Sequence, residues 1–310
     1  MDIQRTWMVA VVRALCGVAM MGCLVGGPVS PAAAALTLGV DFNTDASLDT
    51  DGDNRWEDTQ GVSGFDFELD NSPAVTRMTG VSALPGITAA YDFPGESTGQ
   101  QAGALLSVAD MGGRRSFQNA PGDWSNEDVS IEIWFKPDNL TPTAANGQIL
   151  VEDGGGTGLW FFVSNNELQL RKAPNNVLVS SLIYGISGEF IQAVGTYNVS
   201  SSELELFING SSVGTATSGG SDWTGGDNAA VGTRGQANTG GIGGGQQNTE
   251  SFDGQVAIFR VYRNRDLVAS EVLQNYNHVI NNAPAAPDLP PALVVTPIIN
   301  YDGGLDNGAN

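Results

Sequence analysis

Apolar residues recur at every second position along the central part of this chain, and this spacing decides its class of fold. The pattern is clearest in residues 130–136 and 203–208. Successive side chains of a β-strand point to opposite faces of a sheet, so this period predicts half-buried strands and not helices. The dipeptide Asn209-Gly210 directly follows the second segment and is typical of a two-residue hairpin turn. We therefore expect a β-hairpin made of residues 204–208 and 212–217.

Many further short segments have the composition of strands and are separated by turn residues. The candidates are residues 87–93, 103–109, 148–153, 158–163, 167–172, 177–183, 189–197, 211–217, 228–232 and 254–262. Only residues 271–276 have a helical pattern, with Ser270 as the expected N-cap. The 41 glycines of the chain fit a fold with many turns. Together these features predict an all-β, two-sheet antiparallel sandwich with one short C-terminal helix.

The N-terminal segment, residues 1–35, has the pattern of a secretory signal peptide. Arg5 and Arg13 precede an apolar stretch, and the small residues Ala32–Ala35 supply a cleavage site. The stretch from Ala14 to Val25 is too short to cross a bilayer, which needs roughly 20 residues. The alternative is lipid modification at Cys23, as in bacterial lipoproteins. We expect a secreted, extracellular or cell-surface protein without a transmembrane segment.

The charge of the chain excludes some classes of partner. With 34 acidic and 13 basic residues the net charge is −21, and cleavage of the signal peptide leaves 33 acidic and 11 basic residues. Nucleic acid and anionic membranes would be repelled. Cleavage also removes Cys16 and Cys23, the only cysteines, so the domain must be held together by its core without disulfides.

The chain divides into a domain, a linker and a tail. Residues 36–280 contain no proline-rich break, whereas residues 281–291 carry four prolines. The tail, residues 292–310, is similar to the start of the domain, since both show aliphatic residues, an aromatic beside aspartate, and Leu-Asp in a polar loop. It is either a polar tail or the start of a truncated second domain.

Several pieces in a fixed order resemble a known family. These pieces are Val129–Pro137, Gln192–Tyr197, Leu204–Ser211, Val231-Gly232, Phe252–Tyr262 and the helix near Ser270-Glu271. In this order they resemble the laminin G-like kind of concanavalin A-like jelly roll. The departure is at Gln255 and Ala257, where that family often has acidic residues. The resemblance implies a jelly-roll sandwich that binds glycans or extracellular proteins, often with one calcium ion at its rim.

Ten of the 33 acidic residues of the mature chain lie between Asp41 and Asp70, around the segment 49–58. Aspartates two positions apart in a glycine-containing loop can direct several oxygens toward one point, which suits calcium. We therefore predict a calcium site made of Asp49, Asp51, Asp53 and Asp58. The alternative is a solvated acidic loop.

The residues expected to bind a glycan lie mostly in a glycine-rich stretch, residues 214–245. Trp223 is an indole without apolar neighbours, on which a sugar ring can stack. The other candidates are Asp222, Asp227 and Asn228, which can bind hydroxyl groups, and Trp56 in the acidic loop. For both tryptophans the alternative is an indole folded back onto the core, and Trp134 and Trp160 are expected in the core.

The chain offers little for catalysis. Glu203 and Glu205 share one face of a strand and, like Glu132, alternate with apolar residues, which predicts solvent-facing positions. His278 is the only histidine, so a zinc site built on several imidazoles cannot form. We expect a non-catalytic carbohydrate- or matrix-binding module. A structural or adhesive repeat unit of a larger surface protein and a polysaccharide hydrolase of the same fold are the alternatives.

Overall fold

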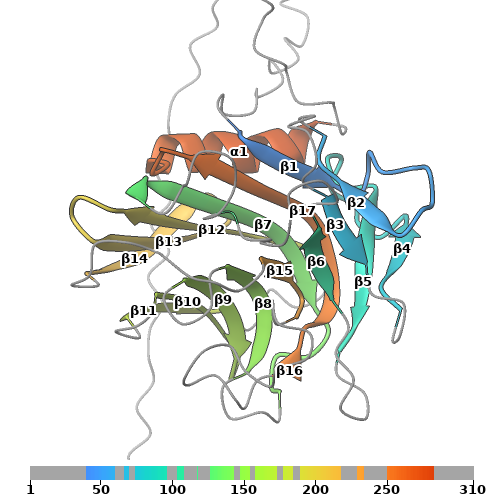
Figure 1. The fold of residues 1–310 in the computed structure, drawn as a ribbon, viewed down its shortest axis with the longest axis horizontal. Coiled ribbons are helices and arrows are strands. Elements are labelled where there is room, and N and C mark those ends of the chain that lie inside the picture. Colours follow the sequence, from blue (N-terminus) through green and yellow to red (C-terminus); the bar gives the residue numbers. More distant parts are fainter. Residues whose placement is uncertain are drawn as a thin grey trace, which may run out of the picture. The chain divides into compact units, whose positions relative to one another are not determined.

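The computed structural model is a sandwich of two β-sheets with one helix (Figure 1). The residues that it describes are 40–59, 66–69, 74–95, 103–107, 117, 126–142, 147–153, 158–172, 177–183, 189–217, 229–233 and 250–282. In this part of the chain no helix has the length and apolar character needed to cross a bilayer.

The first sheet has eight strands. In spatial order they are β14 (Ser211–Thr217), β13 (Glu203–Ile208), β12 (Ile191–Asn198), β7 (Val129–Pro137), β17 (Asp253–Arg263), β5 (Ala89–Pro94) and β4 (Thr76–Thr79), with β1 (Phe42–Asp45) also paired to β17. All of its strand pairs are antiparallel.

The second sheet has nine strands. In spatial order they are β11 (Val177–Leu182), β10 (Glu167–Lys172), β9 (Leu159–Ser164), β8 (Gln148–Asp153), β15 (Ala230–Val231), β6 (Ala104–Ser107), β3 (Asp66–Leu69) and β2 (Arg55–Glu57), with β16 (Glu250–Ser251) parallel to β8. The all-β antiparallel sandwich is thereby confirmed, and the strands predicted at 148–153, 167–172 and 211–217 have the observed bounds.

The hairpin between β13 and β14 forms as predicted. Asn209 and Gly210 have φ angles of 50° and 79°, the two positive values that a type I′ turn requires. Leu204 and Leu206 are buried in the core, whereas Glu203 is exposed. The alternation therefore has the predicted meaning in β13.

An aromatic cluster fills the space between the sheets near β1. Phe42 packs edge-on against Phe67, Phe117 and Phe259, with ring centroids 5.0–6.0 Å apart. All four side chains are at most 1% exposed. Edge-to-face pairs of this kind add to the energy of burial, so β1 is fixed firmly and positions the loop that follows it.

The helix α1 (Ala269–Asn281) packs against the first sheet, on the face opposite the core (Figure 1). The ring of Tyr276 stacks on Trp134 in β7, with centroids 5.7 Å apart and an interplanar angle of 6°. The expected N-cap, Ser270, lies inside the helix, and the actual N-cap is Val268. The carboxylate of Glu271 accepts the Val268 N–H at 3.1 Å and satisfies the end of the helix in place of a serine hydroxyl.

The prediction that Glu132 faces solvent is wrong. Glu132 lies on the outer face of β7, but its side chain is 0% exposed because α1 covers this face. Five donors surround its carboxylate: Trp134 Nε1 (2.9 Å), Gln192 Nε2 (2.8 Å) and Arg260 Nη1 (3.2 Å) at Oε1, and Tyr262 Oη (2.9 Å) and Asn275 Nδ2 (3.1 Å) at Oε2. Burial alone would raise the pKa of Glu132, but Arg260 and these hydrogen bonds hold it below its usual value.

Candidate functional site

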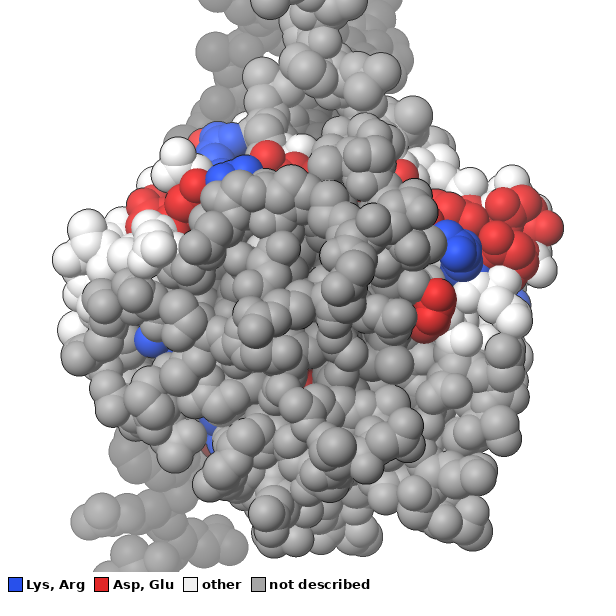
Figure 2. Space-filling view, in the orientation of Figure 1, with Lys and Arg blue, Asp and Glu red and all other residues white. Residues whose placement is uncertain are grey.

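Acidic side chains gather where β1 leads into β2. Figure 2 shows a red surface at the right, in the position that β2 and β4 occupy in Figure 1. The loop of residues 46–54 follows β1, and Gly52 in it has a φ of 75°, a left-handed conformation that glycine adopts at low cost. This turn brings the loop back toward β2.

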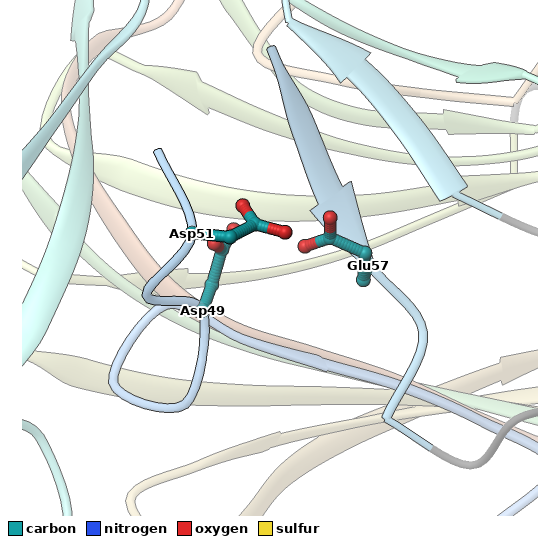
Figure 3. A group of neighbouring side chains, drawn as sticks. All are labelled: Asp49, Asp51 and Glu57. Atoms are coloured by element: carbon teal, nitrogen blue, oxygen red, sulfur yellow. The ribbon is translucent and has the colours of Figure 1, made fainter. Parts of the chain in front are cut away.

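Three carboxylates converge at this loop. Asp49 and Asp51 come from the loop, and Glu57 comes from the end of β2 and faces them (Figure 3). One oxygen from each side chain lies within 4.8 Å of the other two. Asp49 is buried, Glu57 is half-buried and Asp51 is exposed, so the group opens to solvent on one side.

Asp49 is held in place from the core side. The hydroxyl of Tyr91 in β5 donates a hydrogen bond to its Oδ2 and also lies 3.2 Å from the backbone oxygen of Arg55. Burial raises the pKa of Asp49 above its usual value, the Tyr91 hydrogen bond lowers it, and the charge of Asp51 raises it further. The net effect is a raised pKa of Asp49, because nearby positive charge does not compensate for the burial of its carboxylate.

The carboxylate of Glu57 also lacks compensating positive charge, and its pKa is strongly raised. Burial, followed by the charge of Asp49, raises its pKa to about 7. A cation placed among these carboxylates would remove the repulsion between them.

The cluster meets the distance requirement of a calcium ion. Calcium binds oxygen ligands at about 2.3–2.6 Å, so two ligand oxygens on one ion lie at most about 5 Å apart. The 4.8 Å limit of Asp49, Asp51 and Glu57 fits within this range. Hard carboxylate oxygens are also the donors that calcium prefers.

Only two of the four predicted metal ligands, Asp49 and Asp51, belong to this cluster. Asp53 is exposed, and its Oδ1 accepts the backbone N–H of Arg55 at 2.7 Å. The Oδ1 atom of Asp58 accepts the backbone N–H of Asn43 at 2.9 Å. Neither aspartate belongs to the cluster, and Glu57 takes the third position instead.

A depression lies beside the cluster. It has a volume of about 290 Å³ and is lined by Asp53, Asn54, Arg55, Glu68 and Leu69, from the loop, β2 and β3. Arg55 forms an ion pair with Asp66 at 3.2 Å and keeps 39% of its side chain exposed. The lining combines charged, amide and apolar groups, which suits a polar ligand with apolar patches.

Of the five predicted glycan-binding residues, the structure describes only Trp56. Trp56 is 0% exposed and packs in the core against Phe67 and Tyr91, with centroids 5.9 and 5.3 Å apart. No face of its ring is available to a sugar, which removes Trp56 from the candidate ligand-binding residues. The other four, Asp222, Trp223, Asp227 and Asn228, lie outside the described residues.

The residues considered for catalysis lie on two different elements, β13 and α1. Glu203 and Glu205 lie on β13, and Glu205 accepts a hydrogen bond from the Ser212 hydroxyl on β14. His278 lies in α1, far along the chain from both, and its backbone oxygen accepts the Asn282 N–H at 3.0 Å.

The sequence comparison shows the family of this chain. A profile of the concanavalin A-like lectin/glucanases superfamily matches residues 112–273, just over half of the chain. The chain belongs to this superfamily, as the motif order predicts. Comparison with curated protein sequences finds no match.

The fold is also similar to solved botulinum neurotoxin structures. The receptor-binding domain of the C/D mosaic serotype is 12% identical, with a TM-score of 0.51 over 77% of this chain and 51% of that one. The serotype D binding domain is 12% identical, with a TM-score of 0.50 over 77% and 51%. A type C structure is 12% identical, with a TM-score of 0.50 over 78% and 51%, and that toxin depends on interaction with two ganglioside molecules for entering cells. The chain thus spans about half the length of these structures, and the likeness shows the fold.

The raised pKa of Glu57 predicts a pH dependence in cation-free buffer. Because its folded pKa of about 7 exceeds the usual value of 4.5, folding takes up a proton between these values. The contribution of Glu57 to stability therefore falls as pH rises from about 4.5 to about 7. Denaturant unfolding at several pH values in chelator should show this loss, and Glu57→Gln should remove it. An unchanged pH profile in Glu57→Gln would contradict the assignment.

Proposed function

We propose that this chain is a secreted, non-catalytic module that binds carbohydrate or an extracellular matrix component with the help of calcium. Family membership supports a binding fold shared by lectins and glucanases. The observation that carries the proposal is the convergence of Asp49, Asp51 and Glu57 at an open rim. The signal-peptide pattern of residues 1–35 supports secretion.

The proposed ion would do two things. It would neutralise the three carboxylates and fix the loop, and its remaining positions would accept ligand hydroxyl groups, because calcium takes six to eight oxygens. Arg55, Asn54 and Glu68 around the neighbouring depression can then form hydrogen bonds with the same ligand. Trp223 remains a proposed stacking residue.

A glycan array probed with the mature chain, residues 36–310, tests this function. We expect binding in millimolar calcium that is lost in chelator and in Asp51→Asn, because the substitution removes one of the negative charges that hold the ion. Glu203→Gln, on the exposed face of β13, is the matched control and should bind like the wild type. Calcium-independent binding lost only in Trp223→Ala would move the site to residues 214–245, and no binding to glycans or matrix proteins would refute the proposal.

The same preparations test the hydrolase alternative. Release of reducing ends from a polysaccharide, abolished by Glu203→Gln or Glu205→Gln, would show catalysis at β13. We expect no release.

A further inference from the structure

The two sheets end in four strands that differ in charge. The first sheet ends in β14 and β4, and the second ends in β11 and β2. Strand β2 contains Arg55 and Glu57, and β4 contains Arg77, whereas β14 and β11 contain no charged residue and no proline. Charges and prolines are the usual means by which proteins stop sheet edges from pairing with other chains. These means are missing from β14 and β11.

The two uncharged edge strands lie next to each other. They contact one another across the gap between the sheets, on the left in Figure 1. Val213 on β14 is 38% exposed and Leu182 on β11 is 68% exposed. We call the side formed by β14 and β11 the neutral edge.

Strand β14 can accept a further strand. Its side chains are mostly exposed, and residues 214–217 keep a regular register with β13 beyond the bulge at Val213. In an antiparallel pair alternate residues direct their N–H and C=O groups away from the partner. No strand of the described residues pairs with the outer edge of β14, so its outer N–H and C=O groups are donors and acceptors for another strand.

We propose that the neutral edge is the interface between two copies of this chain, with β14 pairing antiparallel to β14 of the second copy. An antiparallel strand pair is self-complementary about a two-fold axis, which is the symmetry of most homodimers. The charge of the chain favours the same place, because a net charge of −21 makes two copies repel each other. The edge strands β14 and β11 themselves carry no carboxylate, the nearest being one strand further in on β13 and β10, and Val213 and Leu182 supply apolar surface.

Sedimentation velocity of the mature chain over a wide range of concentration tests this interface. We expect a monomer–dimer equilibrium in which Leu182→Lys/Val213→Lys weakens the dimer about tenfold or more, because lysines replace the apolar surface of the edge and are a usual block to strand pairing. Thr215→Pro, which alters the outer edge of β14 in another way, should also weaken it. Circular dichroism identifies any variant that has lost its fold.

The edge strand β4 provides the matched control. Met78 is 41% exposed on it, so Thr76→Lys/Met78→Lys makes an equivalent change at the opposite end of the sheet. This control should dimerise like the wild type. A wild type that is monomeric at every concentration would overturn the proposal. A dimer that survives Leu182→Lys/Val213→Lys in its folded form, or that Thr76→Lys/Met78→Lys weakens equally, would overturn it too.

Discussion

Replacing Arg260 with methionine is expected to lower the free energy of unfolding by about 3–5 kcal/mol. Arg260 is 4% exposed, and its Nη1 atom lies 3.2 Å from Glu132, which is completely buried. The substitution removes the positive charge and leaves the Glu132 carboxylate desolvated without an opposing charge. The Arg260 Nε atom also donates to Asn43 Oδ1 at 2.7 Å, and the substitution removes this buried hydrogen bond.

Arg55→Met is the matched control for this measurement. The ion pair of Arg55 with Asp66 has the same 3.2 Å length, but the two side chains are 39% and 22% exposed. Exposed pairs contribute up to about 1 kcal/mol, so the control should lose little. Equal losses in urea unfolding of the two variants would contradict the account of the Glu132 site.

Glu132 also shows where reasoning from the sequence meets its limit. The alternation of β7 correctly predicts which of its residues face the core. It cannot show that α1, more than 130 residues later, covers the other face, because that contact depends on tertiary packing. Gln192 gives the same lesson, since it is buried and donates to Glu132, whereas Trp134 is buried as predicted.

The sequence predicts the strands from β5 onward better than those near the start of the domain. Those from β5 to β17 are rich in β-branched and aromatic residues, and most lie within two residues of the predicted bounds. The strands β1 to β4 and β16 were not predicted, since each has only two to four residues and contains a charged side chain. Their pairing with neighbours distant in the sequence forms them, which no local pattern reveals.

The candidate metal site was predicted in part. The spacing of Asp49 and Asp51 within one loop was visible, and the structure brings these two together. Glu57 was not predicted because it reaches the loop from β2, where pairing of Trp56 with Phe67 in β3 sets its direction. Local hydrogen bonds give Asp53 and Asp58 other roles.

Thermal unfolding of the mature chain in millimolar calcium and then in chelator tests the central claim most directly. A ligand that binds only the folded state at about 100 times its Kd adds about 2.7 kcal/mol. In a domain of this size that raises the unfolding midpoint by roughly 5–10 °C. The account predicts that Asp51→Asn and Glu57→Gln abolish this rise, whereas Asp53→Asn, outside the cluster, keeps it. No rise in the wild type, or a rise that persists in Asp51→Asn and Glu57→Gln, would contradict it.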